Sequence, residues 1–543
     1  DLAQPVGARM SAAAVVGAGR LETAGSAGVN PWLIAVVVSI AAFMEVLDTT
    51  IANVALPYIA GGLGVSEDEA SWVVTTYLVA NAIILTASTA LAEMLGRRKF
   101  YLICVALFTL SSVLCGFAWN LQSLLLFRIL QGLGGGGMVP VSQAILADAF
   151  PPAKRGQAFA VFGVVVVVAP VVGPTLGGWL SDDYSWHWCF LINGPAGILS
   201  MALIALVLPA AKEAVAARSR AGRFQFDIVG FILVATFLGA LEVILDRGLE
   251  DDWFGSRFIV TFAIICGAAF VGMIPWELTR KNPVVDIRMV ATRQFGACFV
   301  VMLAAGAILI ATTQILPQLL QEQFNYTATW AGLALSPGGV SAMVAMFLVG
   351  HLLVYVQPKY LIVAGAAIVA LSMYYLTSLY ADLDFWFFAW SRIYIGIGLP
   401  LFFVPILTAS YDGVPAEKLG QVSALINVAR NVGGSVGVSL SQNVLAHREQ
   451  AHQSRLIEHV IPSAPGYQET LRQATDYFMA QGSTLLHAKQ QAFAWIGQQV
   501  QTQASLLAYI DVFWTLMLVS AAMIPLALLL RNVKLGGDAP PAH

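Results

Sequence analysis

The chain has 543 residues, of which 58% are hydrophobic and 11% are charged, and its mean hydropathy is +0.77. This composition lies far from that of soluble domains and indicates an integral membrane protein. The net charge of −3 is spread thinly, without a basic stripe or acidic tail, which argues against a nucleic-acid or polyelectrolyte partner. The five cysteines mostly lie in apolar runs without metal-site spacing, so we interpret them as packing residues.

Apolar segments of about 20 residues, long enough to cross a bilayer, recur along the chain after a leader at 1–30. The leader lacks a clear charged region and cleavage site, so we interpret it as a flexible cytoplasmic segment, with a signal peptide as the weaker alternative. The fold class is therefore all-α integral membrane, with fourteen predicted transmembrane helices. They are expected at 32–57, 70–92, 100–118, 121–147, 159–180, 188–208, 227–245, 257–276, 296–319, 328–350, 359–379, 385–410, 421–441 and 509–530.

The orientation follows from the distribution of Lys and Arg. An even number of spans puts both termini on one side, and a cytoplasmic N terminus places most of the 28 basic residues in the cytoplasm. The long hydrophilic connection 442–508 then faces outward. Apolar residues at helical intervals in 445–459 and 491–510 predict helical hairpins that dock an adaptor protein. The alternative is that this loop only caps the outer mouth of its own protein.

An internal repeat divides the chain. The segment "LFRILQGLGGGGMVP" at 126–140 has an echo in "WSRIYIGIGLPLFFVP" at 390–405, each with an Arg followed by a Gly-containing run. Two such copies predict two six-helix halves, an arrangement common among secondary transporters. The predicted parts are the leader 1–30, an N-terminal half 31–208, a linker with an inserted helix pair 209–294, a C-terminal half 295–530 and a cytoplasmic tail 531–543.

Two carboxyl groups, Glu45 and Asp48, lie inside the first predicted span. They are three residues apart and therefore share a face of the helix, and ionisable groups at this depth usually face a cavity or a partner. Helix rise places Arg128 at a depth close to that of Asp48, so the two can pair. Because desolvation disfavours a charged carboxyl, we predict that Glu45 exchanges protons or binds substrate; a hydrogen-bonded structural acid is the alternative.

Other charged residues within spans carry weaker signals. Arg430 is expected either to face the cavity with Asn427 or to bond carbonyls of a neighbouring helix, and the two readings are equal. Glu242 and Asp246 lie near the outer end of the inserted pair, where we expect solvation or snorkelling rather than a functional role. Arg392 has no evident acidic partner, and its role is open.

Four motifs resemble the major facilitator superfamily, in its fourteen-helix drug/proton antiporter branch. They are "LDTTIANVALP" (47–57), "RILQGLGGGG" (128–137), "APVVGPTLGGWL" (169–180) and "TALAEMLGRRKFYL" (89–102). The resemblance assigns the conformational switch to Glu93, Gly96, Arg97 and Arg98 of the last motif and to Gly173, Pro174, Gly177 and Gly178 of the third. Thr89, Glu93, Met94 and Ala169 stand where the family usually has other residues.

The likeness runs over nearly the whole chain and implies proton-coupled export of amphipathic drugs across a bacterial inner membrane. It also implies a periplasmic adaptor protein and an outer-membrane channel as partners, with the membrane lipid around the chain. A passive facilitator or metabolite exporter of the same fold is the alternative.

Other function classes fit the sequence poorly. The chain contains no GxxxxGK[ST] phosphate-binding motif, so an ion gradient is the expected energy source. The seven histidines form no ligand pair within a predicted span, and no nucleophile or acid–base constellation stands out. We therefore expect no enzyme activity, no metal and no cofactor.

Overall fold

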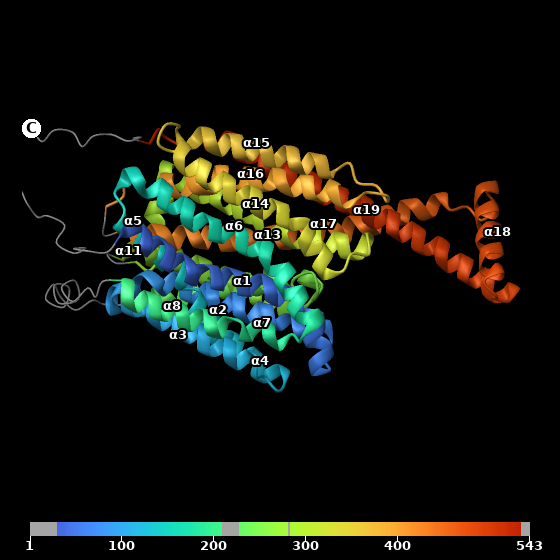
Figure 1. The fold of residues 1–543 in the computed structure, drawn as a ribbon, viewed down its shortest axis with the longest axis horizontal. Coiled ribbons are helices and arrows are strands. Elements are labelled where there is room, and N and C mark those ends of the chain that lie inside the picture. Colours follow the sequence, from blue (N-terminus) through green and yellow to red (C-terminus); the bar gives the residue numbers. More distant parts are fainter. Residues whose placement is uncertain (1–29, 209–226, 281–282, 416–417, 534–543) are drawn as a thin grey trace, which may run out of the picture.

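The computed structural model describes residues 30–208, 227–280, 283–415 and 418–533, which form helices joined by short turns (Figure 1). No β-strand occurs in these ranges, so the all-α prediction is confirmed for them. Almost all of the predicted leader, residues 209–226 of the predicted linker and residues 534–543 of the predicted tail lie outside the described residues.

The long helices run side by side along the bundle, with the earlier ones on one side of it and the later ones on the other (Figure 1). The first group is α1 (Pro31–Leu63), α2 (Glu67–Leu95), α3 (Arg97–Cys115), α4 (Leu121–Gly135), α5 (Met138–Ala149), α6 (Pro152–Asp183), α7 (His187–Leu191) and α8 (Asn193–Val207). Then come α10 (Ile228–Arg247), η1 (Trp253–Gly255), α11 (Arg257–Thr279) and α12 (Ile287–Val290). The last group is α13 (Arg293–Gln323), α14 (Ala328–Leu352), α15 (Pro358–Leu376), α16 (Phe385–Ser410), α17 (Leu419–His459), α18 (Pro465–Ala480) and α19 (Leu485–Leu528).

Thirteen helical stretches of the described residues are long and apolar enough to cross a membrane, and each of them overlaps one of the predicted spans over most of that span's length. The remaining prediction, 421–441, lies in α17, which carries several polar side chains and is not among the thirteen. This part of α17 is nevertheless buried in the bundle. The prediction of fourteen spanning helices is consistent with this arrangement.

Local signals explain where the helices begin and end. Asn30 caps α1 through its side chain, and Ser66 and Glu69 form a reciprocal capping box at the start of α2. Gly64 ends α1 with a φ of 66°, a left-handed conformation that favours glycine. The predicted span 121–147 is interrupted at Gly136 and Gly137, which separate α4 from α5.

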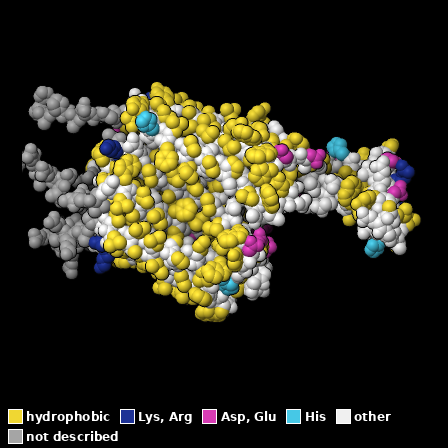
Figure 2. All heavy atoms as spheres, viewed as in Figure 1, with side chains coloured by type: hydrophobic (Ala, Val, Ile, Leu, Met, Phe, Trp, Pro, Cys, Tyr) yellow, Lys and Arg dark blue, Asp and Glu magenta, His cyan; other side chains and the backbone are white. Residues whose placement is uncertain are grey.

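The surface of the bundle is suited to lipid. Large apolar side chains point outward on several helices, among them Leu110, Leu206, Ile264, Val344, Leu371 and Leu518. Figure 2 shows this face covered by hydrophobic side chains, with the bundle's visible Lys and Arg gathered at the end away from α18. The protein is therefore a multi-pass membrane protein.

Residues 442–508 do not form a separate loop. α17 continues without a break to His459, and α19 begins at Leu485 and continues into the bundle, so both spanning segments extend outward as helices. With α18 they form a protrusion at one end of the molecule (Figure 1). Asp511 joins its base, accepting hydrogen bonds from Arg448 at 2.5 Å and from His452 at 2.8 Å. The expected helical character is confirmed: the segments 445–459 and 491–510 lie in α17 and α19, which contact each other, and α18 packs on α19.

α6 packs against α1 on one side and α14 on the other. A Cβ atom at Gly173 would overlap Thr50 of α1, and one at Gly177 would lie 3.2 Å from the carbonyl oxygen of Ile51. Gly178 and Pro174 are buried in the same helix, whose interior also holds Pro170. These small residues allow the close packing that membrane helices need when they meet.

Candidate functional site

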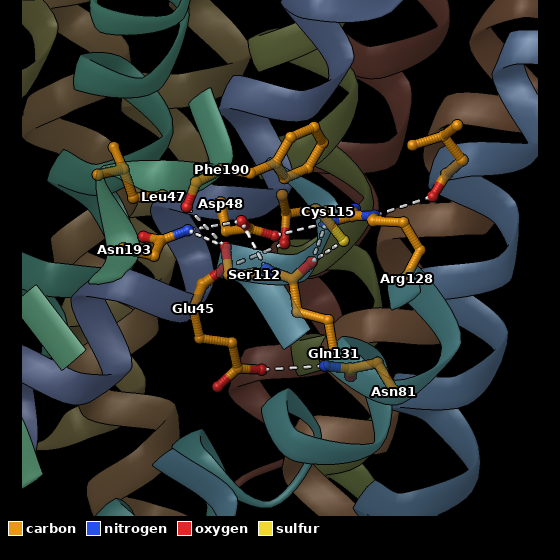
Figure 3. A network of polar contacts seen from close by, with 12 residues as sticks. Glu45, Leu47, Asp48, Asn81, Ser112, Cys115, Arg128, Gln131, Phe190 and Asn193 are labelled. Atoms are coloured by element: carbon orange, nitrogen blue, oxygen red, sulfur yellow. Dashed lines mark hydrogen bonds and ion pairs between the residues drawn. The ribbon is translucent and has the colours of Figure 1, made fainter. Parts of the chain in front are cut away.

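Asp48 and Arg128 form an ion pair in the interior of the helix bundle (Figure 3). Arg128 Nη1 lies 2.7 Å from Asp48 Oδ2, and the exposed fractions of the two side chains are 0% and 1%. The pairing expected from their depths is therefore present. A buried ion pair of this kind is retained only when further hydrogen bonds satisfy both groups.

Those further bonds come from neutral residues on neighbouring helices. Asp48 Oδ1 accepts from Gln131 Nε2 at 2.8 Å and from Asn193 Nδ2 at 2.7 Å. Arg128 Nε donates to the carbonyl oxygen of Val73 at 3.0 Å, and its guanidinium carbon lies 4.2 Å from the centre of the Tyr77 ring. The pair thus connects α1, α2, α4 and α8, so its role in the bundle is structural.

Glu45 is held differently. Its Oε1 accepts from Asn81 Nδ2 at 3.1 Å, and its Oε2 accepts from the backbone N–H of Val139 at 3.2 Å (Figure 3 shows the first bond). Val139 lies at the start of α5, where the helix break exposes backbone N–H groups and the helix dipole favours a carboxylate. Among the described residues, no Lys or Arg nitrogen lies within ion-pair distance of Glu45.

The glycine run of the 128–137 motif, in α4, allows α4 to approach α2 closely. A Cβ atom at Gly132 would lie 2.5 Å from the carbonyl oxygen of Tyr77, and one at Gly135 would lie 2.8 Å from Tyr77 Oη and 3.5 Å from Glu45 Cγ. Glycine is therefore needed for α4 to approach the backbone and the Tyr77 side chain of α2.

Glu45 lines a cavity of about 410 Å³ between α1, α2, α10, α13 and α17. The cavity extends from Glu45 toward Glu250 and Gln442, near the end of the bundle that carries the protrusion. Its size is within the range of small-molecule binding sites. Its wall combines apolar side chains with a few convergent polar groups.

A chain of polar contacts links the two groups of helices across this cavity. Arg430 donates from Nε and Nη2 to Asn431 Oδ1 at 3.2 and 3.1 Å. Asn431 Nδ2 lies 3.4 Å from Asn81 Oδ1, and Asn81 in turn holds Glu45. Arg430 is one of the residues that line the cavity, and its guanidinium has no described bond to a carbonyl of another helix.

Asn427 does not accompany Arg430 into the cavity. Its Nδ2 donates to Gln143 Oε1 of α5 at 2.6 Å, and Ser423 donates to the carbonyl oxygen of Pro140 at the same distance. One turn nearer the start of α17, Thr89 of α2 donates to the carbonyl oxygen of Gly420 at 2.9 Å. These contacts close the bundle between the cavity and the end at which α1 begins.

The expectation of a solvated or snorkelling role was wrong for Glu242, while Asp246 is half-buried. Glu242 is buried and accepts from Ser435 of α17 at 2.6 Å, and Asp246 accepts from Thr75 of α2. Both line the cavity, so α10 of the inserted pair forms one of its walls. Depth along α10 alone suggested solvent, because it does not reveal that α2 and α17 cover this face.

The motif between α2 and α3 lies at the closed end. Gly96 adopts a φ of 85°, which favours glycine, and Arg97 forms an ion pair with Asp148 of α5. Arg98 Nη2 donates to the carbonyl oxygen of Ala205 at 2.6 Å, and Glu93 is half-buried in the last turn of α2. The motif therefore connects α2, α3, α5 and α8 within the first group of helices.

Several site residues escaped the sequence analysis, namely Asn81, Gln131, Gln143, Asn193 and Asn431. All are neutral amides inside apolar spans. The available signal was that such amides are costly to bury and therefore usually have partners.

A bundle of lipid-facing helices around a polar-lined central cavity defines a membrane transporter. The sequence profile of the Major Facilitator Superfamily matches residues 38–438, and the chain belongs to this superfamily, as its motifs suggested. It is thus a transporter and not an enzyme. The solved structure of the proton:xylose symporter XylE, which is 14% identical, has the same fold, with a TM-score of 0.55 over 91% of this chain and 96% of that one.

Relatives with higher identity cover most of the chain. The multidrug export protein EmrB of Escherichia coli strain K12 is 36% identical over 483 residues, which are 89% of this chain and 92% of that protein. The fatty acid resistance protein FarB of Neisseria gonorrhoeae is 37% identical over 446 residues, which are 82% of this chain and 87% of that protein. The resemblance found in the motifs therefore extends to exporters of the EmrB type.

Proposed function

We propose that this protein exports amphipathic drugs or toxic compounds across the bacterial inner membrane, in exchange for protons, by alternating access. The names of its relatives, which concern multidrug export and fatty acid resistance, support the substrate class. The closed end near Asn427 and the cavity on its other side support an alternating mechanism, because the same binding groups can face either side in turn.

The observation that carries the proposal is the position of Glu45. Its carboxyl lies on the cavity wall in the middle of α1, with two hydrogen-bond donors and no cation in ion-pair contact. Such a group can bind a proton without breaking an ion pair, whereas Asp48 is held by Arg128. We assign proton exchange to Glu45 and a positioning role to Asp48 and Arg128. We assign substrate contact to Arg430, and Asn427 contributes to the closed end of the bundle.

The remaining assignments concern the conformational change and the assembly. Glu93, Gly96, Arg97 and Arg98, together with Gly173, Pro174, Gly177 and Gly178, act in the change between states. Both termini are cytoplasmic, so the protrusion is periplasmic. It contacts an adaptor protein that leads to an outer-membrane channel, and the protein is the inner-membrane part of that pump.

Transport by purified protein in proteoliposomes tests this proposal. With an imposed pH gradient, the wild type should accumulate an amphipathic dye above its equilibrium level, and dissipating the gradient should abolish that accumulation. A passive facilitator would only equilibrate the dye, at a rate that the gradient does not affect. That result would overturn proton-coupled export.

A further inference from the structure

Glu277, in the last turn of α11, is a buried carboxyl group that lies outside the central cavity. It is 1% exposed. Its Oε2 accepts from the backbone N–H of Val285 at 3.3 Å, while its Oε1 has no hydrogen-bond partner. Among the described residues, this Oε1 is the only buried carboxylate oxygen without one. An ionised oxygen buried without a donor is costly, so the group is expected to be neutral.

A second carboxyl group, that of Asp227 at the start of α10, shares the space in front of Glu277. A Cβ atom at Gly230 would lie 2.6 Å from Glu277 Oε1 and 2.7 Å from Asp227 Oδ2. The glycine therefore leaves the room in which these two oxygens converge. Two carboxyl groups that share a site in this way are strongly disfavoured from being ionised together.

The two groups differ in the donors that they have. Asp227 Oδ1 accepts from the N–H of Gly230 at 2.9 Å, and Trp276 Nε1 lies 3.1 Å from Oδ1 and 2.9 Å from Oδ2. The N terminus of α10 also favours a negative charge on Asp227. Glu277 has only the Val285 N–H, on its other oxygen. Asp227 is therefore the ionised member, and Glu277 is the one that carries a proton.

No basic side chain of the described residues takes the place of this proton. Those around this end of α11 have other partners, namely Arg280 on the Trp276 ring, Arg288 on the carbonyl oxygen of Leu278, and Lys418 on Asp286. None of them forms an ion pair with Glu277 or Asp227.

A metal ion fits the pair less well than a proton. Hard cations such as Ca²⁺ take six to eight oxygen ligands. Only two carboxyl groups converge here, and the described residues contain no group of three His, Cys, Asp or Glu side chains suited to a metal. A proton needs only one oxygen to bind and a second to accept its hydrogen bond.

We propose that Glu277 is a second proton-binding site of this protein and that its neutral carboxyl group donates a hydrogen bond to Asp227. The site is separate from Glu45 and from the cavity, so this inference goes beyond the proposed function. Glu277 is joined to Val285, and the next residue, Asp286, pairs at 2.8 Å with Lys418 at the start of α17. Loss of the proton places two negative charges where α10 and α11 meet, and weakens their connection to α17.

The stability of the full-length protein in detergent at two pH values tests the proposal. A carboxyl group that keeps its proton only in the folded protein contributes stability that is lost as the pH rises. Between about pH 6 and about pH 9, the temperature at which monodisperse protein is lost should fall by at least about 2 °C more in the wild type than in Glu277→Gln. The amide of the variant takes the place of the proton at both pH values.

Asp286→Asn is the matched control, because it removes the neighbouring ion pair with Lys418 and leaves Glu277 unchanged. It should keep the pH response of the wild type. Equal responses of the wild type and Glu277→Gln would overturn the proposal. Stabilisation of the wild type, but not of Glu277→Gln, by Na⁺ or Ca²⁺ at the lower pH would mean that a metal ion occupies the site, and would overturn it as well.

Infrared difference spectra between the same two pH values detect the proton itself. On raising the pH, the wild type should lose the C=O band of a protonated carboxylic acid that Glu277→Gln lacks. Asp227→Asn offers Glu277 an amide donor in place of a carboxylate, so Glu277 should be ionised at both pH values and the band should again be absent. A band in Asp227→Asn equal to that of the wild type would contradict the proposal even if Glu277→Gln fails to fold.

Discussion

Arg128 Nη1 and Asp48 Oδ2 lie 2.7 Å apart at a site where both side chains are almost fully buried. Hydrogen-bond donors and acceptors from four helices surround the pair, so it holds these helices together within the first group. Glu45, one turn earlier on α1, has no such ion pair. The two acids that the sequence placed together therefore have different environments.

Removing one partner of this pair should be more damaging than removing both. Arg128→Ala leaves the Asp48 carboxylate buried without a cation, which costs about 3–5 kcal/mol in comparable cases. The double variant Arg128→Ala with Asp48→Asn should recover part of this loss, because a neutral amide is cheaper to bury. The measurement is the temperature at which monodisperse protein is lost in detergent.

The matched control is Asp48→Asn alone, which leaves Arg128 without its carboxylate and should also destabilise. If the double variant is as unstable as Arg128→Ala, the pair does not make the contribution described here.

The sequence predicted the helices better than their interruptions. Hydropathy placed the spans because lipid requires about 20 apolar residues. The break at Gly136–Gly137 was not predicted, since glycine is common in membrane helices and often serves only packing. That break matters for function, because it presents the N–H of Val139 to Glu45.

Asn427 and Arg430 of α17 show where prediction of the site from a single helix was limited. Asn427 and Arg430 are three residues apart, and one of the two readings had both of them facing the cavity, yet Asn427 contacts Gln143 and Arg430 lines the cavity. The short side chain of Asn427 contacts the neighbouring helix α5, while the longer side chain of Arg430 extends to the cavity. Which helices meet is a property of the tertiary fold and is not encoded in one helix alone.

Gly173→Ala should weaken the packing of α6 on α1. The added methyl group would overlap Thr50, and overpacking of this kind typically costs about 1–3 kcal/mol. Gly61→Ala on α1 is the control, because a Cβ atom there meets nothing within 4 Å. We expect Gly173→Ala to lower thermal stability in detergent and the rate of dye efflux from cells, and Gly61→Ala to change neither. Equal behaviour of the two variants would contradict this packing role.

Linking Gln143 to Asn427 should stop transport. Their side chains meet at 2.6 Å where α5 and α17 close the bundle, and alternating access requires this contact to separate. A variant with cysteines at both positions, treated with a short bis-methanethiosulfonate that links the two thiols through disulfide bonds, should lose dye transport and regain it on reduction. The five natural cysteines are free and as buried as Gln143 and Asn427, so they are first replaced by alanine to leave only the introduced pair to react. The single-cysteine variants are the controls. Full transport by the linked protein would contradict the claim that the contact between α5 and α17 must separate.

Replacing residues 446–504 with a short flexible linker should abolish capture of the adaptor protein. The protrusion exposes large apolar side chains, including Tyr477 and Leu486, which are 59% and 73% exposed. Such side chains on a helical surface are typical of a protein contact. The measurement is pull-down of the purified adaptor by the tagged transporter.

The alternative is that this segment serves only the transporter itself. Dye transport by the shortened protein in proteoliposomes separates the two readings, and we expect it to be retained. A less disruptive variant, Leu486→Asn with Tyr477→Asn, should weaken capture while leaving the helices in place. Undiminished capture by both variants would place the contact elsewhere, for example at Trp253 and the turn around it.

The most direct test of proton exchange at Glu45 is to separate substrate movement from proton movement in one variant. In proteoliposomes, Glu45→Gln should still exchange labelled for unlabelled drug, since that exchange needs no net proton transfer. It should no longer release protons when drug is added, as followed by a pH-sensitive dye, whereas the wild type should do both. Drug-driven proton release by Glu45→Gln at the wild-type level would contradict the assignment of Glu45 as the proton carrier.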